Sequence, residues 1–190
     1  MNTYTYVESP IGRLLLHSDG VALTGLYMDV PSRPPRGKDD WVEDAGSGPL
    51  PATIRQLREY FAGQRRGFDL PLRFHGTEFQ QRVWNMLTEI PYGATWSYGE
   101  LAKHIDNPHA SRAVGLANGR NPIAIVVPCH RVIGADGSLT GYGGGLERKL
   151  WLLAHEGYVD GRTVIGPADL AAPIPSAASR LRAADREIFP

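Results

Sequence analysis

Cysteine is nearly absent from this 190-residue sequence: Cys129 stands alone, which excludes an intrachain disulfide and the multi-cysteine zinc patterns. The six histidines include no HExxH motif, and His104 and His109 are five positions apart, a spacing that does not stack them on one helix face. A metal site could then be formed only by ligands scattered along the sequence, which we keep as a minor alternative. We therefore expect no metal and no other cofactor.

Long apolar runs are also missing, since no stretch approaches the roughly 20 residues that span a bilayer. The first ten residues, MNTYTYVESP, lack the basic segment and apolar core of a secretory signal. The composition, 42% apolar and 21% charged, is ordinary for a globular protein. We expect a cytoplasmic protein without a membrane partner, built as one domain or as two small ones that share an interface.

Excess charge is the third absence, because 20 basic and 20 acidic residues cancel. A strongly basic balance would indicate nucleic acid, and this chain does not show one. Between positions 107 and 135, however, no Asp or Glu occurs. The basic residues of that stretch are Arg112, Arg120, Arg131, His109 and His130. Such a segment either faces an anionic partner or forms a solvated surface, and charge alone leaves both open.

The first 75 residues predict a small α/β unit. YTYVES, RLLLHS and ALTGLYMDV are rich in strand-forming residues and are separated by turn signals, which indicates an antiparallel meander. The polar, proline-rich stretch at about 31–50 predicts a mobile loop. Apolar residues then recur at helical spacing from Ile54 to Phe61, before Gly63. FDLPLRF reads as one more strand or an extended connector.

The pattern becomes helical after residue 76. Thr77 with Gln80, and Ser97 with Glu100, form two capping boxes that each open a helix. Asn107-Pro108 predicts the end of the second helix and the cap and first turn of a third, which runs to about Asn118-Gly119. Two short helices joined by a tight break are a candidate helix-turn-helix, although the spacing alone favours an ordinary helical hairpin.

Small side chains dominate this third predicted helix. Ala113, Gly115 and their small neighbours surround a lone Arg112. Small residues let a helix backbone approach a DNA groove closely, and a single arginine can then reach into the base stack. Tight packing against another helix uses the same small residues. The sequence leaves these two interpretations balanced.

Cys129 follows a buried apolar segment. Residues 123–127 are continuously apolar and predict a buried strand or extended segment, which Pro128 ends. A glycine-rich loop at 141–145 follows, and then a final helix with Leu146, Leu150, Leu153 and Ala154 on one face and Glu156 in its last turn. Beyond Tyr158 the chain is rich in Ala, Pro and Gly, and we assign that tail no fold.

A lone cysteine is more often a small buried hydrophobe than a nucleophile, but its neighbours here favour the nucleophile. A thiolate needs a nearby positive charge, base or backbone donor, and His130 and Arg131 are adjacent. Neighbouring residues in extended chain point to opposite sides, so we expect a water to bridge the thiol and His130. Glu156 is the acid that would orient the imidazole, which completes a Cys–water–His–Glu relay.

Several motifs then resemble, in order and together, the O6-alkylguanine-DNA alkyltransferase family. The similarity is dense from about residue 76 to residue 157 and looser before it, where only Ser9-Pro10-Ile11-Gly12 matches. The matching motifs are Tyr98-Gly99-Glu100-Leu101-Ala102, Arg112-Ala113-Val114-Gly115, Asn121-Pro122, Pro128-Cys129-His130-Arg131-Val132-Ile133, Gly141-Tyr142-Gly143-Gly144-Gly145 and Leu152-Leu153-Ala154-His155-Glu156-Gly157.

The resemblance implies direct repair of DNA: an irreversible, single-turnover transfer of the alkyl group from O6-alkylguanine, with O4-alkylthymine as a second candidate, onto Cys129. It implies base flipping, double-stranded DNA with an alkylated guanine as the partner, and no obligate protein partner. The expected catalytic residues are Cys129, His130, Glu156, Asn121, which braces the active-site turn, and Tyr98, which contacts the guanine ring. The expected base pocket comprises Tyr98, Val132, Tyr142, Gly143 and Gly144, with the carbonyls of Cys129 and Val132 facing the guanine amine. The expected DNA contacts are Arg112, Ser97, Ala113, Gly115 and Arg120.

The chain departs from the family at Gly143, where some members carry serine, and it lacks the N-terminal cysteines with which some members bind zinc. Two other functions remain as alternatives: a cysteine hydrolase with true turnover, and a lesion sensor without chemistry, which the presence of Cys129 disfavours. The expected fold class is α/β in the α+β sense. Residues 1–75 would form a domain with a small antiparallel sheet and a helix, 76–157 a mostly helical domain with the helix-turn-helix and the cysteine, and 158–190 an unassigned tail.

Overall fold

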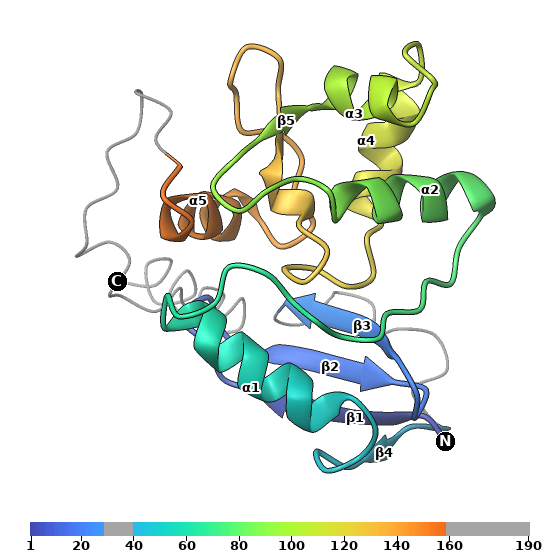
Figure 1. Cartoon of the computed structure of the whole chain (residues 1–190), viewed down its shortest axis with the longest axis vertical. Coiled ribbons are helices and arrows are strands. Elements are labelled where there is room, and N and C mark those ends of the chain that lie inside the picture. Colours follow the sequence, from blue (N-terminus) through green and yellow to red (C-terminus); the bar gives the residue numbers. More distant parts are fainter. Residues whose placement is uncertain (29–39, 159–190) are drawn as a thin grey trace, which may run out of the picture.

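A computed structural model describes residues 1–28 and 40–158 of the chain, and Figure 1 shows their arrangement. The sheet has the order β3-β2-β1-β4. Its strands are β1 (Thr3–Val7), β2 (Leu14–Ser18), β3 (Leu23–Met28) and β4 (Val42–Glu43). The first three form the predicted antiparallel meander, whereas β4 pairs in parallel with β1, so that the sheet is mixed.

The helix α1 (Leu50–Phe61) lies against β1 and β2. It begins at Leu50, earlier than the apolar spacing predicted, because Pro51 is well tolerated in a first helical turn. Residues 29–39 of the predicted mobile loop lie outside the described residues. For residues 40–50 that prediction is wrong, since they contain β4 and the start of α1.

An extended connector joins the sheet unit to the helices, as the FDLPLRF segment predicted. The amide of Leu23 donates to the carbonyl of Pro71 at 2.8 Å, and the amide of Arg73 donates to the carbonyl of Leu23 at 3.0 Å. This single bridge ties the connector to β3. The chain then enters α2 (Glu78–Leu87). Because the connector is bonded to β3, the helical half is tethered to the edge of the sheet.

Both predicted capping boxes are present. The Thr77 and Gln80 pair opens α2, and the Ser97 and Glu100 pair opens α3 (Tyr98–His104). The predicted start of the third helix at Asn107-Pro108 is wrong: α4 is Ser111–Gly119, with Ala110 as its cap. Asp106 takes a left-handed backbone conformation, φ 55°, and turns the chain through residues 107–110 before α4 can begin.

Helices α3 and α4 pack on each other, and α2 packs on both. On α4, Val114 and Ala117 are buried, and the indole nitrogen of Trp84 donates to the carbonyl of Ala117 at 2.8 Å. Arg112 and Ala113 are on the exposed side. One side of α4 therefore packs closely against the neighbouring helices. The other side, with Arg112 and Ala113, is exposed, and we call it the slim outer face of α4.

The apolar segment 123–127 is buried but is not a strand. Ile123 makes one bridge to Leu26 of β3, and Ile125 has φ 70°, so the chain folds back within the segment. Cys129–Arg131 follow as a single 3-10 turn, η2, before β6 (Val132–Ile133) pairs in parallel with β5 (Trp96–Ser97). This reversal of the chain precedes the buried Cys129. The continuous apolar sequence does not reveal it.

The last helix, α5 (Leu146–His155), buries a different face from the one predicted. Leu146 is 50% exposed, and Leu150 and Ala154 are half-buried. The buried residues are Arg148, Lys149, Trp151, Leu152 and Leu153. The inward face thus carries two long basic side chains, which brings α5 close to the polar cluster around η2.

The sheet half and the helical half share one apolar core. Leu14 of β2, Leu57 of α1, Leu87 of α2 and Leu152 of α5 belong to the same cluster of buried side chains. None of the helices in the described residues has the length and apolar character that crossing a membrane requires. The shared core fixes α1 relative to α5, a relation on which the site below depends.

Candidate active site around Cys129

Cys129 opens η2 and has a free thiol that is only 5% exposed. The thiol lines a cavity of about 480 Å³, within the usual range for small-molecule sites. Its wall is formed by β3, the residues after α4 and the glycine-rich loop; it includes Met28, Asn118, Asn121, Tyr142, Gly143 and Gly144. The cavity therefore lies where the sheet half meets the helical half.

His130 and Glu156 are joined as the sequence predicted. Nε2 of His130 lies 2.9 Å from Oε1 of Glu156, and both side chains are fully buried. The other ring nitrogen, Nδ1, is buried and has no hydrogen-bond partner among the described residues. With Glu156 ionised, Nε2 carries the ring proton and Nδ1 keeps its lone pair, so that Nδ1 is the nitrogen able to accept a proton.

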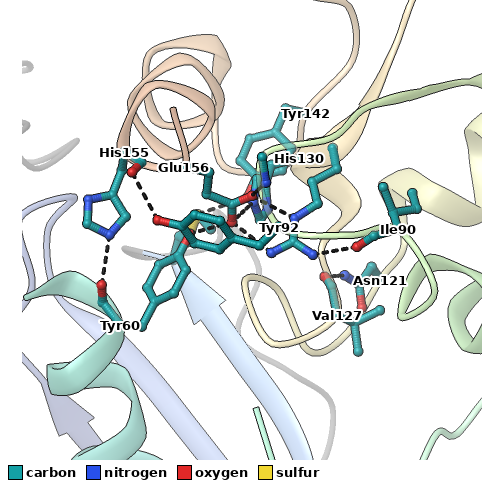
Figure 2. Close-up of polar contacts among 12 residues, drawn as sticks. Tyr60, Ile90, Tyr92, Asn121, Val127, His130, Tyr142, His155 and Glu156 are labelled. Carbon is teal, nitrogen blue, oxygen red and sulfur yellow. Dashed lines mark hydrogen bonds and ion pairs between the residues drawn. The ribbon is translucent and has the colours of Figure 1, made fainter. Parts of the chain in front are cut away.

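Glu156 accepts hydrogen bonds from three further residues, and Figure 2 shows the cluster in which the carboxylate lies beside His130. Arg131 donates from Nε to Oε2 at 2.7 Å and from Nη2 to Oε1 at 2.9 Å. The backbone amide of Gly93 donates to Oε2 at 3.2 Å, and the hydroxyl of Tyr60 donates to Oε1 at 2.7 Å. The carboxylate is thus held by α1, by the turn after α2 and by η2 at once.

Arg131 belongs to the basic segment for which the sequence left a solvated surface and an anionic partner open, and the structure shows it buried instead. The residue is 6% exposed, pairs with Glu156 and also donates to the carbonyl of Ile90 at 2.6 Å. His130 is fully buried as well. The exposed basic residues of this segment among those described are His109, Arg112 and Arg120.

The charges of the cluster follow from burial and pairing. Although burial opposes ionisation, the bonds from His130 and Arg131 hold the pKa of Glu156 far below its usual range. Burial lowers the pKa of His130 despite the carboxylate beside it, so the imidazole is neutral at rest. Burial also raises the pKa of the Cys129 thiol. The resting site is therefore a neutral thiol and a neutral base next to a fixed anion.

Polar neighbours oppose the cost of ionising the thiol. Against the effect of burial, the polar side chains of Asn121 and Tyr142 and the charge of Lys149 lower the pKa of the Cys129 thiol. The amide of Asn121 also donates to the carbonyl of Val127 at 2.8 Å, and its oxygen accepts from the amide of Ile123 at 3.0 Å. Asn121 therefore bonds to both ends of the segment 123–127, in which the chain reverses. Such contacts are what its predicted bracing role requires.

Lys149 is fully buried and donates to the carbonyls of Val132 at 2.7 Å and Thr140 at 2.8 Å. Burial lowers the pKa of this lysine to about 8. The carbonyl oxygen of Val132, which was expected to face the base, thus already accepts a hydrogen bond from Lys149. One lone pair of this oxygen remains for a second donor. The carbonyl of Cys129 accepts from the side-chain amide of Asn118 at 3.4 Å.

Tyr98 begins α3, and its hydroxyl donates to the carbonyl of Thr140 at 3.2 Å. In this arrangement the tyrosine holds the glycine-rich loop, and it would release that bond to contact a base. At Gly144 a Cβ would lie 2.5 Å from the sulfur of Met28 and 2.9 Å from the ring of Tyr142, so a side chain there would require those side chains to move. At Gly143 a Cβ would meet only the carbonyl of Gly119 at 3.6 Å, so a serine there would fit.

The predicted DNA contacts lie on α4 or just past its end, except Ser97, which precedes α3. Arg112 and Ala113 are exposed near its start, and Arg120 is exposed just past its end. Gly115 is half-buried, and a Cβ there would lie 3.6 Å from the ring of Tyr98. Ser97 is occupied as the cap of α3, accepting from the amide of Glu100 at 3.1 Å.

Two residues of the cluster were not predicted. Tyr60 contacts Glu156 although 96 positions separate them, and Lys149 is buried on α5 but was not among the residues of the apolar face that the sequence predicted. The only available signal for Lys149 was its position one turn after the glycine-rich loop, and Tyr60 had none beyond its place in α1. No group of three or more metal-ligating side chains occurs in the described part of the chain.

The fold and the site together define a class: a sheet unit packed on a helical unit, with one thiol in the cavity between them and an ionised cluster behind it. Residues 2–74 match the model of the 6-O-methylguanine DNA methyltransferase ribonuclease-like domain, and residues 78–158 match that of the same family's DNA binding domain. The chain belongs to the methylated-DNA–protein-cysteine methyltransferase family.

Individual relatives are similar over most of their length. The methylated-DNA–protein-cysteine methyltransferase of Methanosarcina acetivorans is 54% identical over 154 residues, which cover 81% of this chain and 97% of the relative. That of Mycobacterium tuberculosis is 54% identical over 153 residues, or 80% and 91% of the two chains. A crystal structure of Mycobacterium tuberculosis OGT in complex with DNA superposes with a TM-score of 0.77 at 51% identity, covering 88% of this chain and 97% of the other.

Proposed function

We propose that this chain repairs alkylated DNA by moving a methyl or larger alkyl group from O6 of guanine to the sulfur of Cys129. The observation that carries the proposal is a free thiol on the wall of a cavity, directly before a buried imidazole whose far nitrogen is paired with a carboxylate. Family membership and the relative in complex with DNA support it.

The geometry supports a specific route for the proton. The thiol gives its proton to Nδ1 of His130, through a water because no hydrogen bond joins the two side chains in the structure. The imidazolium that forms is stabilised by Glu156, which is already ionised. Asn121, Tyr142 and Lys149 lower the cost of the thiolate. The proton thus moves from the thiol to the imidazole, and the summed charge of these two buried groups stays zero.

The transfer itself is a substitution at the alkyl carbon. The sulfur lone pair forms the S–C bond, the C–O6 bond breaks, and its electron pair stays on the guanine, which is restored after protonation. Tyr98 would offset the developing charge once its hydroxyl leaves the carbonyl of Thr140. A thioether has no easy hydrolysis, so each molecule reacts once.

Access to a base in the duplex requires flipping, which costs a few kcal/mol and less at a damaged pair. The slim outer face of α4 would lie along the DNA with Ser97, Ala113 and Gly115 near the backbone and Arg120 at its end. Arg112 would fill the gap that the flipped nucleotide leaves. Tyr98, Val132, Tyr142, Gly143 and Gly144 would surround the base. The neutral net charge predicts a shallow salt dependence of binding.

We also propose the division of the chain at about residue 75, with residues 1–75 as the sheet domain and 76–157 as the domain that binds DNA and carries the thiol. A cytoplasmic location fits the chemistry, because a nucleophilic thiol must stay reduced and the cytosol keeps thiols in that state. O4-alkylthymine remains a proposed second substrate.

The decisive experiment is the intact mass of the protein after incubation with a duplex that contains one O6-methylguanine, followed by peptide mapping. The expected result is one methyl group on Cys129, saturating at one per protein, and none in Cys129→Ala, which should still bind the duplex. Repeated turnover would indicate a hydrolase instead. An unmodified protein that binds the intact lesion would indicate a sensor.

A further inference from the structure

The carboxylate of Glu156 receives one of its hydrogen bonds from the sheet half of the molecule. The hydroxyl of Tyr60, near the end of α1, donates to Oε1 at 2.7 Å. Both residues are buried, with Tyr60 fully enclosed and Glu156 5% exposed. A short bond to a charged acceptor in a dry environment is among the stronger hydrogen bonds in proteins. In Figure 2 the tyrosine reaches the cluster from the side opposite Asn121.

The ring of Tyr60 is held on several sides, which fixes the hydroxyl. Its own carbonyl lies 2.7 Å from Nε2 of His155, the residue before Glu156. Aromatic rings surround it at centroid distances of 5.0 Å (His155), 5.3 Å (Phe61), 5.4 Å (Phe68) and 6.3 Å (Tyr92). The hydroxyl therefore cannot follow Glu156 if the carboxylate rotates, and instead it determines where Oε1 rests.

We propose that Tyr60 is a positioning residue for the alkyl transfer: its hydroxyl holds Oε1 of Glu156 in the orientation that accepts from His130. The inference rests on the proposed function, and it deepens it by assigning the sheet half a direct part in the chemistry. Oε1 is the atom that Tyr60, His130 and Nη2 of Arg131 share. Without the hydroxyl, the carboxylate is free to turn toward Arg131 and Gly93, and the imidazole loses its fixed partner.

The electrostatic consequence has a definite sign. Once Oε1 is free to turn away, the protonated imidazole loses part of its stabilisation by the carboxylate, so the pKa of His130 falls. His130 would then be a weaker base for the thiol proton, and the thiolate would form less readily. The ionisable groups around the pair come from α1, the turn after α2, η2 and α5; they are Tyr60, Tyr92, Arg131 and Lys149. Tyr60→Phe changes only the first of these.

The test measures the rate constant of methyl transfer in single-turnover reactions, at saturating duplex DNA, between about pH 5.5 and pH 9. Tyr60→Phe should react about tenfold more slowly near neutral pH, the effect of one hydrogen bond to a charged group. Its acid limb should move to lower pH, and its affinity for DNA should not change. Tyr4→Phe is the matched control, because it removes a tyrosine hydroxyl that donates to a carboxylate outside the cluster, Oε2 of Glu43 at 3.5 Å on the sheet. It should react like the wild type.

A double mutant separates positioning from packing. If Tyr60 acts through Glu156, Tyr60→Phe should add little to the loss in a Glu156→Gln background. A tenfold loss that is the same at every pH, or that persists in full in that background, would overturn the inference. So would an unchanged rate in Tyr60→Phe. These outcomes leave the proposed function intact as long as the wild type transfers its methyl group, whereas a wild type without transfer removes both.

Discussion

Replacing Glu156 by glutamine tests how far the fold depends on this one carboxylate. The substitution keeps the shape of the side chain but removes its charge and converts one acceptor into a donor. The new amide would face the donors of Gly93 and Arg131, and the guanidinium of Arg131 would remain buried without a counter-charge. Breaking a buried ion pair by removing one partner costs about 3–5 kcal/mol. For a chain of this length that loss corresponds to a fall in Tm of roughly 6–20 °C.

Urea denaturation of wild type and Glu156→Gln at neutral pH would measure this difference, with Glu89→Gln as the control. Glu89 is exposed, so the same chemical change there should stay within about 0.5 kcal/mol. Because the folded pKa of Glu156 is strongly depressed, its contribution is complete above the ordinary glutamate pKa of about 4.3 and shrinks in more acid solution. A loss below about 1 kcal/mol at neutral pH would refute the reasoning, since the carboxylate would then not be the counter-charge of Arg131.

Three other predictions concern single side chains. Arg112→Ala should slow repair of duplex DNA by about tenfold or more while leaving reaction with free O6-alkylguanine unchanged; equal losses on both substrates would argue against a role in flipping. Tyr98→Phe should slow the chemical step in single-turnover assays, and an unchanged rate would remove its assigned role. Burial lowers the pKa of His17 to about 4, so folding favours the neutral ring, and stability should fall as the pH drops from about 6.5 toward 4. His17→Gln should flatten that part of a curve of unfolding free energy against pH, and a curve parallel to that of the wild type would contradict the assignment.

Local chemistry predicted the parts of the fold whose cause is local. The capping boxes at Thr77 and Ser97 were found exactly as read, because both partners of each box lie within one turn of the chain. The antiparallel meander followed from residue preference and turns in the same way. The parallel strand β4 was missed, since two residues between polar segments carry no periodic signal.

The failures occurred where tertiary contacts override local preference. Asn107-Pro108 is a good helix start, yet the left-handed turn at Asp106 delays α4 to Ser111. Residues 123–127 look like a strand, but Ile125 reverses the chain and only Ile123 bridges to the sheet. A left-handed isoleucine is strained, and only the surrounding packing can maintain it. No pattern in a single sequence reports such packing.

The site shows the same division. Cys129, His130 and Glu156 were predicted from the chemistry a thiolate needs and from the family resemblance, and the structure places the last two in contact. Arg131 was expected near the thiol, but its pairing with Glu156 was not predicted, because the two residues are 25 positions apart and buried together. The contact between Tyr60 and Glu156 could not be predicted from the sequence. A contact between residues so far apart in the chain depends on how the two halves pack together. The role of Tyr60 in the chemistry stays a prediction.

The order in which the cluster appears during synthesis gives the buried carboxylate a further consequence. Tyr60 leaves the ribosome first, Cys129 and His130 follow, and Glu156 comes last. Until Glu156 arrives, the imidazole has no anion beside it, and the thiol lacks the buried surroundings that α5 supplies through Lys149. A nascent chain that lacks α5 would therefore carry a cysteine without these neighbours. The proposed alkyl transfer would begin only once α5 has packed against η2.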